Sequence, residues 1–134
     1  MKTIEGIYGS KLTSVVIQGS ETAIGEITFK GCENLETLIL PETLTWIQGY
    51  AFECCSNLTE IVLPKNLSNI GDGVFRECSS LTDITLPRAL FHLGHSVFEG
   101  CTSLEKIVLS EHIYFRHINS VQEYEKLGIT VVTV

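Results

Sequence analysis

The sequence predicts an α/β-type repeat solenoid, a single domain with about five stacked coils of about 23 residues each and a C-terminal helix–strand cap. The observation behind this prediction is one spacing shared by residues of unrelated chemistry. The step from Cys32 to Cys55 recurs unchanged in four columns: Cys32, Cys55, Cys78 and Cys101; Pro41, Pro64 and Pro87; Phe29, Phe52, Phe75 and Phe98; Leu12, Leu35, Leu58, Leu81 and Leu104. A fixed period of roughly 20 to 50 residues is typical of proteins built from stacked coils.

The repeats occupy residues 9–109, between an N-terminal cap at 1–8 and a C-terminal cap at 110–134. The clearest units run from Cys55 to Glu77 and from Cys78 to Gly100, and the first unit, from Gly9, keeps only part of the pattern. Atypical end units are expected, because a terminal coil has a neighbour on one side only.

Each coil begins with a strand. Ile61 and Leu63 alternate with Glu60 and Val62, as a strand with one buried face requires. Pro64 ends the strand, since proline offers no N–H to the sheet. The chain then returns through Leu67 and Ile70, and Gly71 and Gly73 suit tight bends. Val74 and Phe75 point back into the core.

The C-terminal residues predict a closing element. Ser120–Lys126 reads as a short helix, Gly128 as its C-cap, and Ile129–Val134 as a last strand. The strand either completes the cap or presents an exposed edge for pairing, because "ITVVTV" is β-branched, uncharged and terminal.

The stretch "NLTEIVLPKNLSNIGDGVFREC" resembles the BspA-like (Treponema-type) leucine-rich repeat. The resemblance extends from about Gly9 to Leu109. It implies a short right-handed leucine-rich repeat solenoid with a parallel β-sheet along its concave face.

The four cysteines of the column raise three alternatives: metal ligands, disulfides or a structural repeat. Equivalent Cα atoms of stacked coils lie about 4.8 Å apart, and parallel side chains keep the Cβ atoms farther apart than a disulfide prefers. A column also diverges where metal ligands must converge. We therefore expect four free, buried thiols, with Cys54, which lies off the column, as the exposed one. No metal and no cofactor is expected.

Composition limits the partners. The formal net charge of −7 disfavours nonspecific binding to nucleic acid or to an anionic membrane. No apolar run approaches the ~20 residues of a membrane span, and the start "MKTIEGIYGS" lacks the pattern of a signal peptide. No catalytic residues stand out by spacing, so we expect no enzyme. His92 and His95 are read as surface residues.

The candidate binding residues are the outward positions of the predicted strands. The central column contains Val16, Ile39, Val62, Thr85 and Val108. The column beside it contains Ser14, Thr37, Glu60, Asp83 and Lys106. A contiguous apolar stripe indicates a partner, although β-branched residues also simply favour sheets.

The most favoured function is therefore non-enzymatic protein binding through the concave sheet. The resemblance implies surface proteins of host-associated bacteria, some of them adhesins for matrix proteins such as fibronectin or fibrinogen, and so favours a cell-surface or secreted location. The alternative is a structural spacer or a segment that self-associates, which would give a homodimer.

Overall fold

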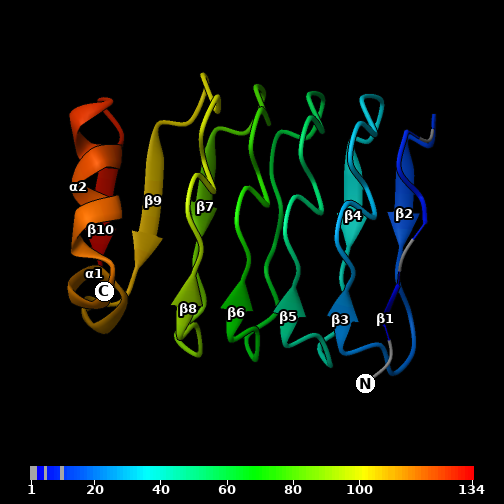
Figure 1. The fold of residues 1–134 in the computed structure, drawn as a ribbon, viewed down its shortest axis with the longest axis horizontal. Coiled ribbons are helices and arrows are strands. Elements are labelled where there is room, and N and C mark those ends of the chain that lie inside the picture. Colours follow the sequence, from blue (N-terminus) through cyan, green and yellow to red (C-terminus); the bar gives the residue numbers. More distant parts are fainter. Residues whose placement is uncertain (1–2, 5, 10) are drawn as a thin grey trace.

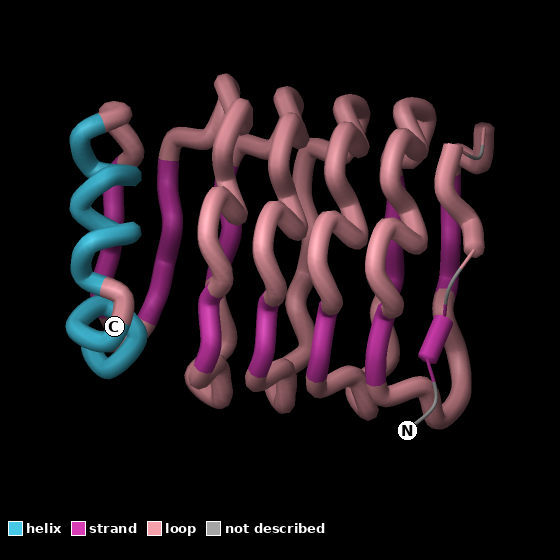
Figure 2. Tube along the Cα trace, viewed as in Figure 1, coloured by secondary structure: helices cyan, strands magenta, loops and turns pink. Residues whose placement is uncertain are grey.

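The fold is a stack of parallel coils with two opposite sheet faces. The computed structural model describes residues 3–4, 6–9 and 11–134, so the predicted cap at 1–8 lies partly outside the described residues. The elements are β1 (Thr3–Ile4), β2 (Ser14–Val16), β3 (Ala23–Ile24), β4 (Thr37–Ile39), β5 (Trp46–Ile47), β6 (Asn69–Ile70), β7 (Asp83–Thr85), β8 (His92–Leu93), β9 (Lys106–Leu109), α1 (Glu111–Arg116), α2 (Ile118–Lys126) and β10 (Thr130–Thr133). Figures 1 and 2 show the coils side by side, with the helices at the C-terminal end.

All strands pair in parallel. The return face is a five-stranded sheet in the order β1-β3-β5-β6-β8. The opposite face, here called the strand face, contains the strands of the L-x-x-L-x-L segments and has two sheets, β2-β4 and β7-β9-β10. Within the repeats, partners on both faces are one repeat apart in the sequence, as in Val16 opposite Ile39 and Trp46 opposite Asn69. The predicted solenoid with parallel sheets is confirmed.

The strand face is interrupted at its centre, which the sequence did not predict. The segment Glu60–Leu63 forms no strand, and in the described chain its backbone makes no hydrogen bond to either neighbouring coil. Just before it, the amide of Thr82 donates to the carbonyl of Thr59 at 3.2 Å. The strand face therefore consists of two parallel sheets on either side of the segment Glu60–Leu63. Nothing in the sequence explains the break, since Thr59–Leu63 follows the same pattern as its neighbours.

The alternation of buried and exposed residues is nevertheless as predicted. Ile61 and Leu63 are buried, whereas Glu60 and Val62 are exposed. The core behind this segment contains a stack of phenylalanine rings. The ring centroids of Phe29, Phe52, Phe75 and Phe98 are separated by 5.2, 5.8 and 5.9 Å, with nearly parallel planes.

The cysteine column has a role that the spacing alone did not reveal. Each thiol donates a hydrogen bond to a backbone carbonyl 25 or 26 residues earlier. Cys55 reaches the carbonyl of Phe29 at 3.2 Å, and Cys78 reaches that of Phe52 at 3.1 Å. The expectation of four free, buried thiols is confirmed, and the thiols also connect adjacent coils.

Cys54 is half-buried rather than exposed, so that prediction needs correction. It lies in a turn column, with Gly31, Glu77 and Gly100, in which every residue has a positive φ between 60° and 76°. Burial raises the pKa of the Cys54 thiol, and the carboxylates of Glu53 and Glu77 raise it further.

Two other positions differ from the sequence prediction. Gly73 has φ +60° and forms the expected bend, but Gly71 has no positive φ. A Cβ at Gly71 would instead lie 2.8 Å from the backbone nitrogen of Gly49, so this glycine allows adjacent coils to approach closely. Leu12, in the core leucine column, is 48% exposed because it lies in the terminal coil.

The C-terminal cap contains the predicted helix and strand, plus one helix that was not predicted. Helix α2 and β10 correspond to the predicted elements, and Gly128 adopts φ +87° after the helix. Strand β10 pairs with β9 as the last strand of its sheet. Helix α1 precedes them and buries Ile113.

Candidate protein-binding face

The five residues of the central column lie in line across the strand face. Val16 pairs with Ile39, and Thr85 pairs with Val108, in the registers of their sheets. Val16, Ile39 and Val62 are 52%, 54% and 81% exposed, and Val108 is half-buried. The first three side chains give the face an apolar centre open to solvent.

The second predicted column lies along one edge of this centre. Thr37 pairs with Ser14, and Lys106 pairs with Asp83. All five residues are exposed, namely Ser14, Thr37, Glu60, Asp83 and Lys106. The column is uncharged in the first two coils, acidic in the next two and basic in the fifth.

Lys65 and Arg88 lie at the opposite edge, and with Glu42 and Glu111, the first residue of α1, they form a charged column of the repeat that the sequence analysis missed. Glu42, Lys65, Arg88 and Glu111 follow one another at the spacing of the repeat and are all exposed. Three of them come directly after the proline column, and Glu111 comes after Ser110 at the equivalent place. This spacing was the signal that could have identified them. Val132 of β10, opposite Val108, extends the apolar centre and was also missed.

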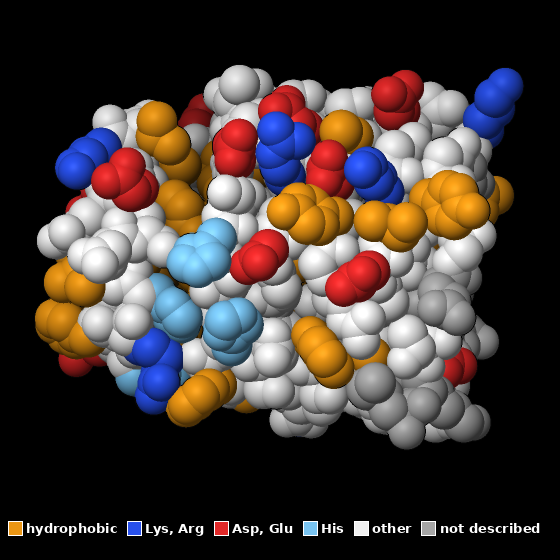
Figure 3. Space-filling model, in the orientation of Figure 1, with side chains coloured by type: hydrophobic (Ala, Val, Ile, Leu, Met, Phe, Trp, Pro, Cys, Tyr) orange, Lys and Arg blue, Asp and Glu red, His pale blue; other side chains and the backbone are white. Residues whose placement is uncertain are grey.

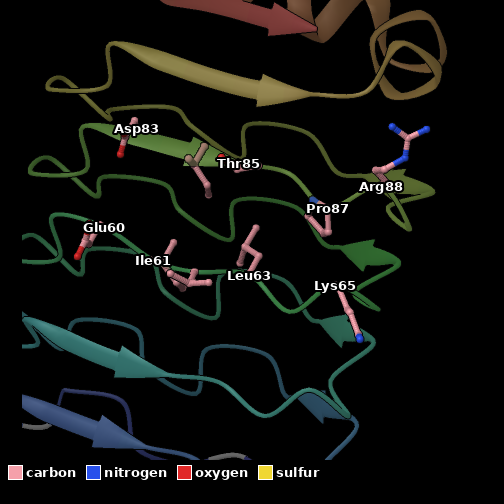
Figure 4. A pocket seen from close by; sticks show the side chains of 10 residues that line it. Glu60, Ile61, Leu63, Lys65, Asp83, Thr85, Pro87 and Arg88 are labelled. Atoms are coloured by element: carbon pink, nitrogen blue, oxygen red, sulfur yellow. The ribbon is translucent and has the colours of Figure 1, made fainter. Parts of the chain in front are cut away.

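A shallow groove of about 480 Å³ lies between the coils of Val62 and Thr85. Its lining includes Val62, Thr85 and Pro87. Glu60 and Asp83 lie at one end of the groove, and Lys65 and Arg88 lie at the other (Figure 4). The groove therefore offers an apolar middle between an acidic end and a basic end.

The thiols with the strongly raised pKa values lie in the core and not on the strand face. Burial raises the pKa of Cys55 and Cys101 to about 12. Across the described residues, no three His, Cys, Asp or Glu side chains gather as metal ligands.

The return face presents a second group of exposed side chains, next to the C-terminal helices. Histidines gather there (Figure 3). His92 and His95 are exposed, as expected, and the ring of His92 is 6.3 Å from that of His117. The Arg116 guanidinium lies 3.8 Å from the centre of the exposed Phe91 ring. Burial lowers the pKa of His117, and the nearby His92 and Arg116 add to this effect.

The repeat pattern is that of a known family. The model of the BspA type leucine rich repeat region matches residues 6–124, in six copies. The chain belongs to this family. No helix among the described residues of this BspA-type repeat protein is long and apolar enough to cross a bilayer.

Two solved structures resemble this BspA-type repeat protein. A leucine-rich repeat protein of T. pallidum has 35% identity and a TM-score of 0.78, over 80% of this chain and 50% of that one. A leucine-rich repeat protein of Bacteroides ovatus ATCC 8483 has 27% identity and a TM-score of 0.75, over 95% of this chain and 38% of that one. The chain thus spans half or less of the length of both. No curated protein matches the sequence.

Proposed function

We propose that this BspA-type repeat protein binds another protein through its strand face. The observation that carries the proposal is the 81% exposure of Val62 at the centre of an apolar column. Exposed contiguous apolar surface on a folded protein usually marks an interaction site. The charged columns on both sides give the site a polar rim, which is the usual anatomy of a protein interface.

We propose further that the protein acts at a cell surface or is secreted, as an adhesion module. This finer proposal is supported by the family, whose members include surface proteins of host-associated bacteria. Fibronectin and fibrinogen are the first partners to test.

The test compares two substitutions of exposed apolar residues. Val62→Glu changes the centre of the strand face, and Leu127→Glu changes a 74% exposed residue on the C-terminal cap. We expect both variants to keep the circular dichroism spectrum of the wild type. In biolayer interferometry against immobilised fibronectin and fibrinogen, Val62→Glu should lose binding, and Leu127→Glu should retain it.

A structural spacer is the second candidate function. It is favoured by the length comparison, because both solved relatives are at least twice as long as the segment they share with this chain. A spacer would show no binding that depends on Val62. Equal binding by Val62→Glu and wild type would therefore refute the proposed use of the strand face.

A further inference from the structure

The charges beside the apolar column follow a rule across three coils. Each coil has one sign at one edge of the strand face and the opposite sign at the other edge. The pairs are Glu60 with Lys65, Asp83 with Arg88, and Lys106 with Glu111. The order of signs reverses in the third pair, and it reverses at both edges together.

Asp83 and Lys106 are cross-strand partners in β7 and β9, but the two charges within each coil lie at opposite edges of the strand face. Glu60 and Asp83 lie at the opposite end of the groove from Lys65 and Arg88 (Figure 4). In the described chain, none of the six takes part in an ion pair within 4 Å; the ion pairs that form involve Lys30, Glu53, Arg76, Glu99, Glu123 and Lys126. The six side chains are exposed and available to another molecule.

We propose that the strand face binds a second copy of this chain, related by a two-fold axis parallel to the direction in which the coils stack. The inference rests on the proposed function, since it names the partner of the same face. Rotation about this axis exchanges the two edges and keeps each coil opposite its own copy. Glu60 then meets Lys65 of the second copy, Asp83 meets Arg88, and Lys106 meets Glu111.

Because a two-fold interface is self-complementary, every such pair occurs twice. The apolar residues Val16, Ile39 and Val62 lie between the two edges and meet their own counterparts. An apolar centre with charged pairs at the rim fixes both affinity and register.

The other possible two-fold axis, parallel to the strands, is disfavoured by the same charges. It would reverse the order of the coils. With this axis through the middle of the five coils, the coil of Glu60 and Lys65 would meet its own copy with its edges unchanged. Glu60 would then face Glu60, and Lys65 would face Lys65. Like charges in direct apposition disfavour an interface.

The overall charge of the chain also favours contact at this face. The two edge columns together contain three of the nine basic residues but only four of the sixteen acidic ones. The rest of the molecule is strongly acidic and would repel a second copy. The two edge columns have a net charge of only −1, although Glu36 and Glu105 also line the strand face.

The first experiment uses charge reversal and charge exchange in the whole chain. Size-exclusion chromatography with light scattering and sedimentation equilibrium, in reductant, should show a wild-type dimer. Glu60→Lys should weaken dimerisation about tenfold to a hundredfold, because it opposes Lys65. The double variant Glu60→Lys/Lys65→Glu, which exchanges the charges and keeps the net charge, should restore dimerisation to within about threefold of wild type.

A cross-linking experiment tests the direction of the axis. In a Cys54→Ser background, Ile39→Cys should form a disulfide-linked dimer when oxygen is supplied with copper–phenanthroline, because each coil faces its own copy. With the axis parallel to the strands, these residues would be two coils apart, about 10 Å, which is too far for a disulfide. The Cys54→Ser variant without Ile39→Cys is the control, because its four remaining cysteines are buried in the core and should not form the cross-link.

The outcomes separate this inference from the proposed function. At a protein concentration of about 100 μM, even a weak homodimer would be populated. A wild-type chain that is monomeric at this concentration would overturn the inference. Loss of fibronectin or fibrinogen binding in Val62→Glu would still support the proposed function. A dimer that survives Val62→Glu uses another surface and would overturn the inference. Unchanged binding of fibronectin and fibrinogen by that variant would separately refute the proposed function. A dimer that Glu60→Lys breaks and the exchange variant does not restore would rule out the charge-paired arrangement.

Discussion

At the scale of single residues, the cysteine column is explained by hydrogen bonding as well as by size. The carbonyl of Phe52 accepts the amide of Cys55 and the thiol of Cys78, both at 3.1 Å. A carbonyl has two lone pairs, so both bonds can form together. A small side chain that fits the core and still donates one hydrogen bond meets both demands at this position.

Two substitutions of Cys78 distinguish hydrogen bonding from packing. Cys78→Ala removes the donor, whereas Cys78→Ser keeps one. If the hydrogen bond matters, the serine variant should be more stable than the alanine variant by about 0.5–1.5 kcal/mol. Urea unfolding followed by circular dichroism measures the difference. The reverse order, with alanine the more stable, would mean that the site selects only for an apolar side chain.

The buried thiols also predict a loss of stability in alkali. Burial raises the pKa of Cys55 and Cys101 to about 12 and the pKa of Cys78 further still. The folded chain thus keeps protons that the unfolded chain releases near pH 9. Stability is complete below that pH and falls as the pH rises towards 12, by up to about 1.4 kcal/mol per pH unit for each thiol.

Urea midpoints measured between pH 8 and pH 10.5 test this prediction. Cys78→Ala should show a shallower decline than wild type, because it has one buried thiol fewer. Cys54→Ser changes only the half-buried thiol and should decline nearly as steeply as wild type. Equal slopes in Cys78→Ala and wild type would show that other groups cause the alkaline loss.

At the scale of the elements, the turn column of Gly31, Cys54, Glu77 and Gly100 places non-glycine residues in a left-handed backbone. Glu77 has φ +60°, a conformation that costs a residue with a Cβ roughly 1–2 kcal/mol. Glu77→Gly should therefore be more stable than Glu77→Ala by about 1 kcal/mol. The alanine variant is the matched control, since it removes the same carboxylate without relieving the backbone. Equal urea midpoints would contradict the prediction.

The elements that the sequence predicted are those that depend on periodicity. The spacing of the repeat established the alternation at Ile61 and Val62, because one buried face requires it along every strand. The break at Glu60–Leu63 could not be predicted, since hydrogen bonds between coils depend on distances that the pattern does not contain. Helix α1 was missed because Ile113 lies one repeat after Leu90, so the sequence shows the same core spacing there as in the coils.

The same limit applies to the strand face. Its apolar column and one charged edge followed from the strand pattern, because alternate residues must point outward. The other edge was missed because Lys65 and Arg88 lie beyond the prolines, where the strand frame no longer assigns a side. Only the three-dimensional arrangement shows that they lie at the opposite end of the groove from Glu60 and Asp83.

At the scale of the whole molecule, the two ends of the solenoid are closed unequally. The C-terminal end is covered by a cap that buries Ile113, Val121 and Tyr124, and the Tyr124 ring packs edge-on against Phe98 at 5.3 Å. At the other end, Leu12 is 48% exposed, whereas Leu58 in the same column is fully buried. Each coil of a solenoid is stabilised by its neighbours, so this difference predicts unequal local stability.

Hydrogen exchange followed by mass spectrometry should reveal this gradient. The amide of Ile17, bonded to the carbonyl of Ile39, should exchange about a hundredfold faster than that of Gly71, bonded to the carbonyl of Ile47. Substitutions should follow the same order: Leu58→Ala should cost about 3–4 kcal/mol in global stability, and Leu12→Ala less than about 1 kcal/mol. Equal protection along the whole chain, together with equal costs for the two leucines, would show that the solenoid unfolds as one cooperative unit and that the first coil is as firmly held as the rest.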